Sequence, residues 1–195
     1  MHRLTHLVVV TALAAGAVSC GDVVRQGRAP VFLVIDSLQA ANGSDPGTFF
    51  SVLLSDVVTA GSFFNDPGRV VLRIVPKDIG GTAPTVLSTN NEVTMTRYHV
   101  SYRRADGRNT QGVDVPYAFD GVATGTVGPG TSLTLGFQLV RNVAKKESPL
   151  VQLVTNPVII TMIADVTFYG QDRVGNDVSA SGAVQIDFGN FGDGA

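Results

Sequence analysis

The chain has 195 residues, and its 14 Lys and Arg residues nearly balance 16 Asp and Glu residues, giving a formal net charge of −2. This balance excludes the overall basicity that is typical of nucleic-acid-binding domains, and the single cysteine excludes an internal disulfide framework. Hydrophobic residues make up 44% of the chain, which is enough to build one domain with a substantial core.

Residues 1–19 have the pattern of a secretory signal peptide. Arg3 supplies a positive charge, and residues 7–18 then run without any charge. Spanning a bilayer takes about 20 apolar residues, so this run is too short for a transmembrane helix. A buried core helix is the alternative, but no later segment of the sequence has the pattern of a helix. We therefore expect export and removal of residues 1–19.

Small residues lead into the single cysteine of the chain. The stretch Ala17-Val18-Ser19-Cys20 resembles the lipobox of bacterial lipoproteins, whose usual form is Leu-Ala/Ser-Gly/Ala-Cys, although Ala17 stands where leucine is commoner. The resemblance implies cleavage before Cys20 and acylation of its thiol. It also implies sorting to the outer membrane, because Gly21 rather than Asp follows the cysteine. The alternative is an ordinary cleavage site beside a chance cysteine.

A lipidated Cys20 would leave only a short connection to the folded part of the chain. Residues 20–30 would form the acylated amino terminus and its tether. Two or more acyl chains give stable membrane anchoring. The ten residues 21–30 reach at most about 33 Å when fully extended, so we expect the folded part to stay close to the lipid surface.

Alternation of apolar and polar residues predicts strands through the rest of the chain. In chain order, the expected strands are 31–39, 48–58, 70–76, 93–104, 113–119, 121–127, 131–140, 158–168 and 178–188. The pattern is clearest in 131–140, where Leu133, Leu135 and Phe137 share one face. Clusters rich in Gly, Pro, Asn and Asp separate the strands, for example NGSDPG at 42–47.

These strands predict an all-β fold, a single antiparallel two-sheet sandwich of about eight to ten strands. We expect it to cover residues 31–189 and to resemble immunoglobulin or fibronectin III domains. Residues 190–195 would form a flexible tail. The apolar stretch 149–168 is interrupted by Asn156 and Pro157, so we interpret it as strand rather than as a membrane span.

The end of the chain carries a second resemblance. The stretch ADVTFYGQDRVGNDVSASGAVQIDF is similar to the last hairpin of bacterial immunoglobulin-like and HYR-type modules. The matching positions are Val166, Thr167, Phe168, Asp172, Gly175 and Asn176. This resemblance implies an immunoglobulin-like sandwich. The chain lacks tryptophan and has one cysteine, so the Cys…Trp…Cys pattern of antibody domains is excluded.

Residues for catalysis are scarce. Of the three histidines, two precede the predicted cleavage site, and His99 is expected on the outward face of a strand. No G-x-S-x-G motif accompanies it, which argues against a Ser-His hydrolase. The aspartates fall mostly in turns, where they bond to the backbone rather than form a glycosidase pair. We expect a protein that is not an enzyme.

The turn at residues 172–177 is the best candidate for a metal. Calcium accepts oxygen ligands from loops, and Asp172, Asn176 and Asp177 offer them, with Asp45 and Asp66 in the two DPG turns as further candidates. The alternative is that these side chains only form the turn. Zinc is excluded because clusters of His and Cys are absent. We expect no cofactor, with calcium as the alternative.

The one cationic stretch lies near the middle of the chain. It comprises Arg97, His99, Arg103, Arg104 and Arg108, with Asp106 as the single acid among them. Such a patch predicts an anion-binding surface for phosphate or carboxylate groups. A solvated face with nearby counter-charges such as Asp114 and Asp120 is the alternative.

Together, these features predict a membrane-anchored envelope lipoprotein that acts as a non-catalytic binding, adhesion or assembly module. Its expected partners are the membrane, through the acyl anchor, and envelope proteins, lipopolysaccharide or glycans. Nucleic acid is not expected. A glycan- or calcium-dependent ligand-binding module is the alternative, followed by a hydrolase.

Overall fold

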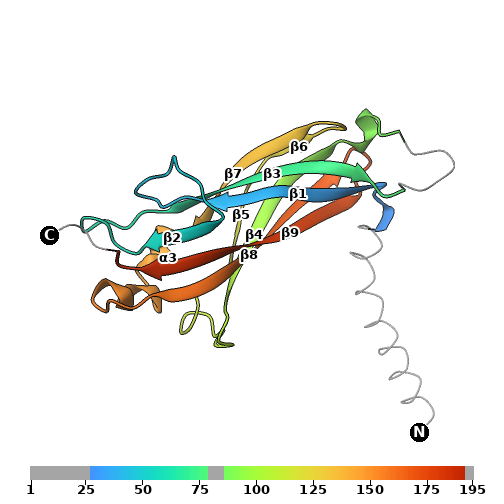
Figure 1. Cartoon of the computed structure of the whole chain (residues 1–195). Coiled ribbons are helices and arrows are strands. Elements are labelled where there is room, and N and C mark those ends of the chain that lie inside the picture. Colours follow the sequence, from blue (N-terminus) through green and yellow to red (C-terminus); the bar gives the residue numbers. More distant parts are fainter. Residues whose placement is uncertain (1–26, 79–85, 192–195) are drawn as a thin grey trace, which may run out of the picture.

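The computed structural model describes residues 27–78 and 86–191 (Figure 1). The predicted signal peptide, Cys20 and the first part of the tether lie outside the described residues, as does the end of the predicted tail at 192–195. No helix within the described ranges is long and apolar enough to cross a membrane.

Two β-sheets pack against each other, which confirms the predicted all-β sandwich. The first sheet has the order β1-β3-β7, formed by Val31–Ala40, Asp66–Pro76 and Ser132–Val140. The second has the order β2-β9-β8-β4-β5, with β6 paired to another part of β4. These strands are β2 (Val52–Asp56), β4 (Val93–Arg104), β5 (Phe119–Gly121), β6 (Gly125–Val127), β8 (Ile160–Asp172) and β9 (Asp177–Gly189).

The chain passes between the two sheets several times, because β1, β3 and β7 lie in the first sheet and β2, β4, β8 and β9 lie in the second. Neighbouring strands are antiparallel with one exception, since β2 pairs in parallel with β9 from Val52 opposite Gln185 to Asp56 opposite Gly189. β2 is the first strand in the order of the second sheet and therefore forms one of its edges.

Several expected strands have different limits in the structure. The sequence pattern predicts a strand over 113–119, but this segment is mainly a turn, in which the Asp114 N–H donates to the Thr110 carbonyl and the preceding Gly112 has a φ of +76°. Residues 150–154 form the 3₁₀ helix η2 (Leu150–Val154) instead of a strand. Leu150 and Leu153, three residues apart, are both buried by this turn of helix.

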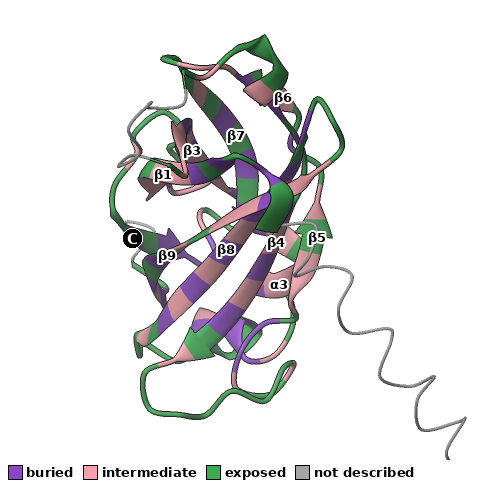
Figure 2. Ribbon diagram, turned by 90° about the vertical axis from the view of Figure 1, so that its right-hand side faces the viewer, coloured by how far each residue is buried: buried purple, intermediate pink, exposed green. Residues whose placement is uncertain are grey.

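The interior follows the period-two pattern. Along β8, the buried Met162, Ala164, Val166 and Phe168 alternate with more exposed residues, as Figure 2 shows by colour. Fully burying such an apolar side chain contributes about 1.5–3 kcal/mol. Because the apolar faces of both sheets meet in this way, the polar faces and the loops are left for contacts with other molecules.

Candidate functional site

A pocket lies where the chain passes from the first sheet to the edge of the second. At the end of β1, Ala40 and Phe50 exchange two backbone hydrogen bonds of 2.8 and 2.9 Å. Between these two residues, the chain at 41–49 arches outward and returns to β2. The arch and the edge of β2 enclose a cavity of about 340 Å³.

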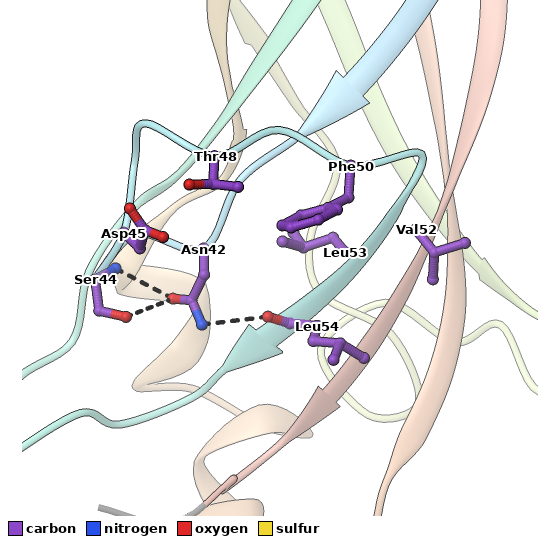
Figure 3. Close-up of a pocket in the computed structure, with 8 residues that line it drawn as sticks. All are labelled: Asn42, Ser44, Asp45, Thr48, Phe50, Val52, Leu53 and Leu54. Carbon is purple, nitrogen blue, oxygen red and sulfur yellow. Dashed lines mark hydrogen bonds between the residues drawn. The ribbon is translucent and has the colours of Figure 1, made fainter.

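The pocket has a polar wall and an apolar wall (Figure 3). The arch supplies Asn42, Ser44, Asp45 and Thr48, and the returning chain supplies Phe50, Val52, Leu53 and Leu54. Three of the apolar side chains remain open to solvent, with exposed fractions of 54% for Phe50, 41% for Val52 and 56% for Leu54. Leu53 points into the core and is buried, so it forms the floor.

Asn42 fixes the shape of the arch. Its side-chain oxygen accepts hydrogen bonds from the Ser44 N–H and the Ser44 hydroxyl, both at 3.1 Å. Its amide donates to the Leu54 carbonyl at 3.2 Å, which ties the arch to β2 (Figure 3). Gly43 is required beside it, because a Cβ there would overlap the Asn65 carbonyl oxygen. The pocket is therefore preformed by local hydrogen bonds.

A buried ion pair between Lys145 and Asp66 lies beside the pocket. Lys145, at the end of the short helix α3 (Asn142–Lys145), reaches Asp66 at the start of β3, with Nζ 2.8 Å from Oδ1. Both side chains are fully buried. The Gly43 N–H donates to Oδ1 of Asp66 at 2.9 Å, and the Ser55 hydroxyl donates to Oδ2 at 2.6 Å.

Every charge in this cluster has several partners. Lys145 also donates to the Asp56 carbonyl at 2.8 Å. Burial raises the pKa of Asp66, and the charge and hydrogen bond of Lys145 only partly oppose this effect. Removing one member of such a buried pair typically costs about 3–5 kcal/mol, because the other charge loses its partner. The cluster thus holds together the arch, β2, β3 and α3.

The predicted anion-binding patch is divided by acidic residues. Arg97 and His99 both contact Asp120, at 3.3 and 3.2 Å, and Arg103 contacts Asp165 at 2.7 Å. The Arg97 guanidinium also stacks on the Tyr169 ring, 3.7 Å from its centroid. These side chains remain on the surface, with counter-charges beside them, and they do not form one undivided positive face.

Arg104, the last residue of β4, and Arg108, in the loop that follows, form a separate cluster. Both guanidinium groups contact Asp106, at 2.8 and 2.7 Å. The hydrogen bonds from Arg108 and then from Arg104 hold the pKa of the Asp106 carboxyl well below its usual range. In return, Asp106 raises the pKa of Arg108.

The calcium candidates are engaged in the turn between β8 and β9. Asp172 Oδ1 accepts hydrogen bonds from the backbone N–H groups of Val174 and Asn176, at 3.0 and 2.8 Å. Its Oδ2 accepts from the Asn176 side chain at 2.7 Å, and Asp177 accepts from Gln171. Within 27–78 and 86–191, no group of three or more His, Cys, Asp or Glu side chains is placed to hold a metal ion.

Sequence reasoning missed both the pocket and the buried pair. The sequence presents Asp66 only as a turn residue and a calcium candidate, and Lys145 lies 79 residues further along the chain. No local motif links them, since their contact depends on how α3 packs under the arch. A signal for the pocket was present in the Phe50, Val52 and Leu54 alternation, which places apolar side chains on the outer face of a strand. Comparison with protein-family models and with curated proteins finds no match for this chain.

Proposed function

We propose that this chain is an exported lipoprotein, held to the membrane through Cys20, whose β-sandwich is a non-catalytic binding and assembly module. The pocket between the arch and β2 is its binding site. The lipobox resemblance supports the anchor, and the preformed pocket supports the binding role.

The exposed apolar edge of β2 carries this proposal. Natural edge strands are usually shielded by charge, proline or a covering element, because an open edge pairs with other chains. Here, Phe50, Val52 and Leu54 are all exposed at the edge. Apolar surface gathered beside polar groups is typical of interaction sites.

The pocket fits an extended segment of another envelope protein. The Leu54 carbonyl faces the arch rather than β9 and already accepts a hydrogen bond from Asn42. Alternate residues of a strand direct their backbone groups to the same side, so Val52 would offer the backbone groups at this edge. An added strand would bond to this edge and place apolar side chains on Phe50 and Val52.

The location of the pocket suits an anchored module. β1 carries the chain from Val31 to Ala40, so the pocket lies at the opposite end of the sandwich from residue 31 (Figure 1). A ten-residue strand is about 33 Å long. The tether would therefore leave the pocket directed away from the lipid surface and accessible to a partner.

Site-specific photo-crosslinking in intact cells tests this function. The photoreactive amino acid p-benzoylphenylalanine would replace Leu54 in the full-length protein or, as the matched control, the exposed Val174 in the β8–β9 turn. We expect a discrete crosslinked product with an envelope protein from position 54, absent from position 174 and lost when Phe50→Asp is added. Equal crosslinking from both positions, or none from position 54, would contradict the proposal.

A further inference from the structure

We propose that Lys145 and Asp66 condense after folding into an intramolecular amide bond, which covalently locks the region beneath the pocket. The structure holds the two groups as an ion pair, in contact and fully buried. The proposal concerns a modification site and is independent of which partner the pocket binds.

The amine is fixed against the carboxyl group from two sides. Nζ lies 2.8 Å from Oδ1 of Asp66 and 2.8 Å from the carbonyl oxygen of Asp56. Cγ, the carbon that an amine attacks, is the next atom after Oδ1. Reacting atoms held at about 3–3.5 Å in a fixed geometry gain a large rate advantage over the same groups in solution.

Two donors are directed at the carboxyl oxygens. The Gly43 N–H lies 2.9 Å from Oδ1, and the Ser55 hydroxyl lies 2.6 Å from Oδ2. A backbone N–H and a hydroxyl in this position stabilise the negative charge that develops on oxygen when a nucleophile adds to the carbon. The same groups also keep the carboxyl from rotating away from the amine.

The reaction needs no co-reactant. One proton passes from the Lys145 ammonium to the Asp66 carboxylate, which yields a neutral amine and a neutral acid. The amine forms a C–N bond to Cγ, a second proton moves from nitrogen to a carboxyl oxygen, and that oxygen leaves as water. Burial raises the pKa of Asp66, which favours the neutral acid that this sequence requires.

The product would remove two buried charges and join distant parts of the chain. Asp66 is the first residue of β3, and Lys145 is the last residue of α3. Gly43 and Ser55, which donate to the carboxyl group, flank pocket residues Ser44 and Leu54. An amide bond there would fix the floor and the arch of the pocket as one unit.

Mass spectrometry tests the bond on the full chain. Protein purified from membranes would be denatured and digested with trypsin. We expect a branched peptide that joins the Lys145 and Asp66 segments, with a mass one water below the sum of the two peptides. We also expect no cleavage after Lys145. Intact wild-type segments with cleavage after Lys145 would overturn the proposal, whatever the behaviour of any variant.

Two lysine variants provide the comparison. Lys145→Arg retains the positive charge but removes the amine, so the branched peptide should be absent. Lys146→Arg changes the neighbouring exposed lysine and should leave the branched peptide intact. A branched peptide that persists in Lys145→Arg and is lost in Lys146→Arg would assign the bond to Lys146 and contradict the proposal.

Discussion

Tyr102 on β4 donates its phenolic hydrogen to the Leu139 carbonyl on β7 at 2.6 Å, so that one hydrogen bond joins the two sheets across the core. Tyr98, four residues earlier on the same face of β4, accepts a second hydrogen bond between the sheets, from the Gln138 N–H at 3.1 Å. Buried tyrosines thus act both as core residues and as links between the sheets.

Replacing Tyr102 by phenylalanine should lower the free energy of unfolding by about 1–3 kcal/mol, because the buried Leu139 carbonyl loses its donor. Urea unfolding monitored by circular dichroism measures this change. Tyr117→Phe is the matched control, since Tyr117 is exposed, and it should unfold at the wild-type midpoint. Equal urea midpoints for both variants would show that the hydrogen bond between the sheets contributes nothing to the free energy of unfolding.

The fold was predictable because it depends on local alternation, whereas the site depends on distant contacts. The faces of β7, β8 and β9 follow from every second residue, and the structure confirms them. The limits of β2 could not be predicted, because they depend on where the arch returns to Ala40. The Lys145–Asp66 pair could not be predicted either, since two lone charged residues carry no mark of burial in sequence.

Replacing Cys20 by serine should release the protein from membranes, because the acyl anchor has no thiol to which it can attach. Detergent-phase partitioning and fractionation measure the release. Ala17→Leu is the matched control, since it brings the lipobox closer to its usual form and should leave the protein in the membrane fraction. Continued partitioning of Cys20→Ser into the detergent phase would contradict the anchor.

The Asp106 carboxyl should stay ionised at a pH at which ordinary aspartates, with a pKa of about 3.9, are half protonated. Arg108 and Arg104 hold its pKa below that range in the folded protein, so its contribution to stability is present above the unfolded pKa and is lost only as the pH falls through the lower folded value. Carbon-13 NMR titration of the side-chain carboxyl carbons measures this. An Asp106 midpoint at the ordinary aspartate value of about 3.9 would refute it.

Replacing Arg103 and Arg104 together by glutamine should weaken binding to anionic lipid vesicles if the predicted anion surface is correct. Each positive charge near an anionic membrane contributes about 1 kcal/mol at moderate salt, and vesicle sedimentation at several salt concentrations measures the loss. Arg173→Gln, which removes an arginine paired with Glu92, is the matched control. Unchanged vesicle binding in the double variant would contradict the anion-binding surface. Arg103 and Arg104 would then serve only as ion-pair partners of Asp165 and Asp106.

The turn between β8 and β9 should be stable without calcium, because the protein itself supplies the hydrogen bonds to Asp172. Asp172→Ala removes three of these bonds and should lower the free energy of unfolding by about 1–3 kcal/mol. Asp45→Ala, in the exposed arch, is the control and should have little effect on the melting temperature. Adding a chelator should leave the wild-type melting temperature unchanged, as calorimetry would show. A drop of many degrees on chelation, reversed by added calcium, would instead assign a metal to Asp172, Asn176 and Asp177.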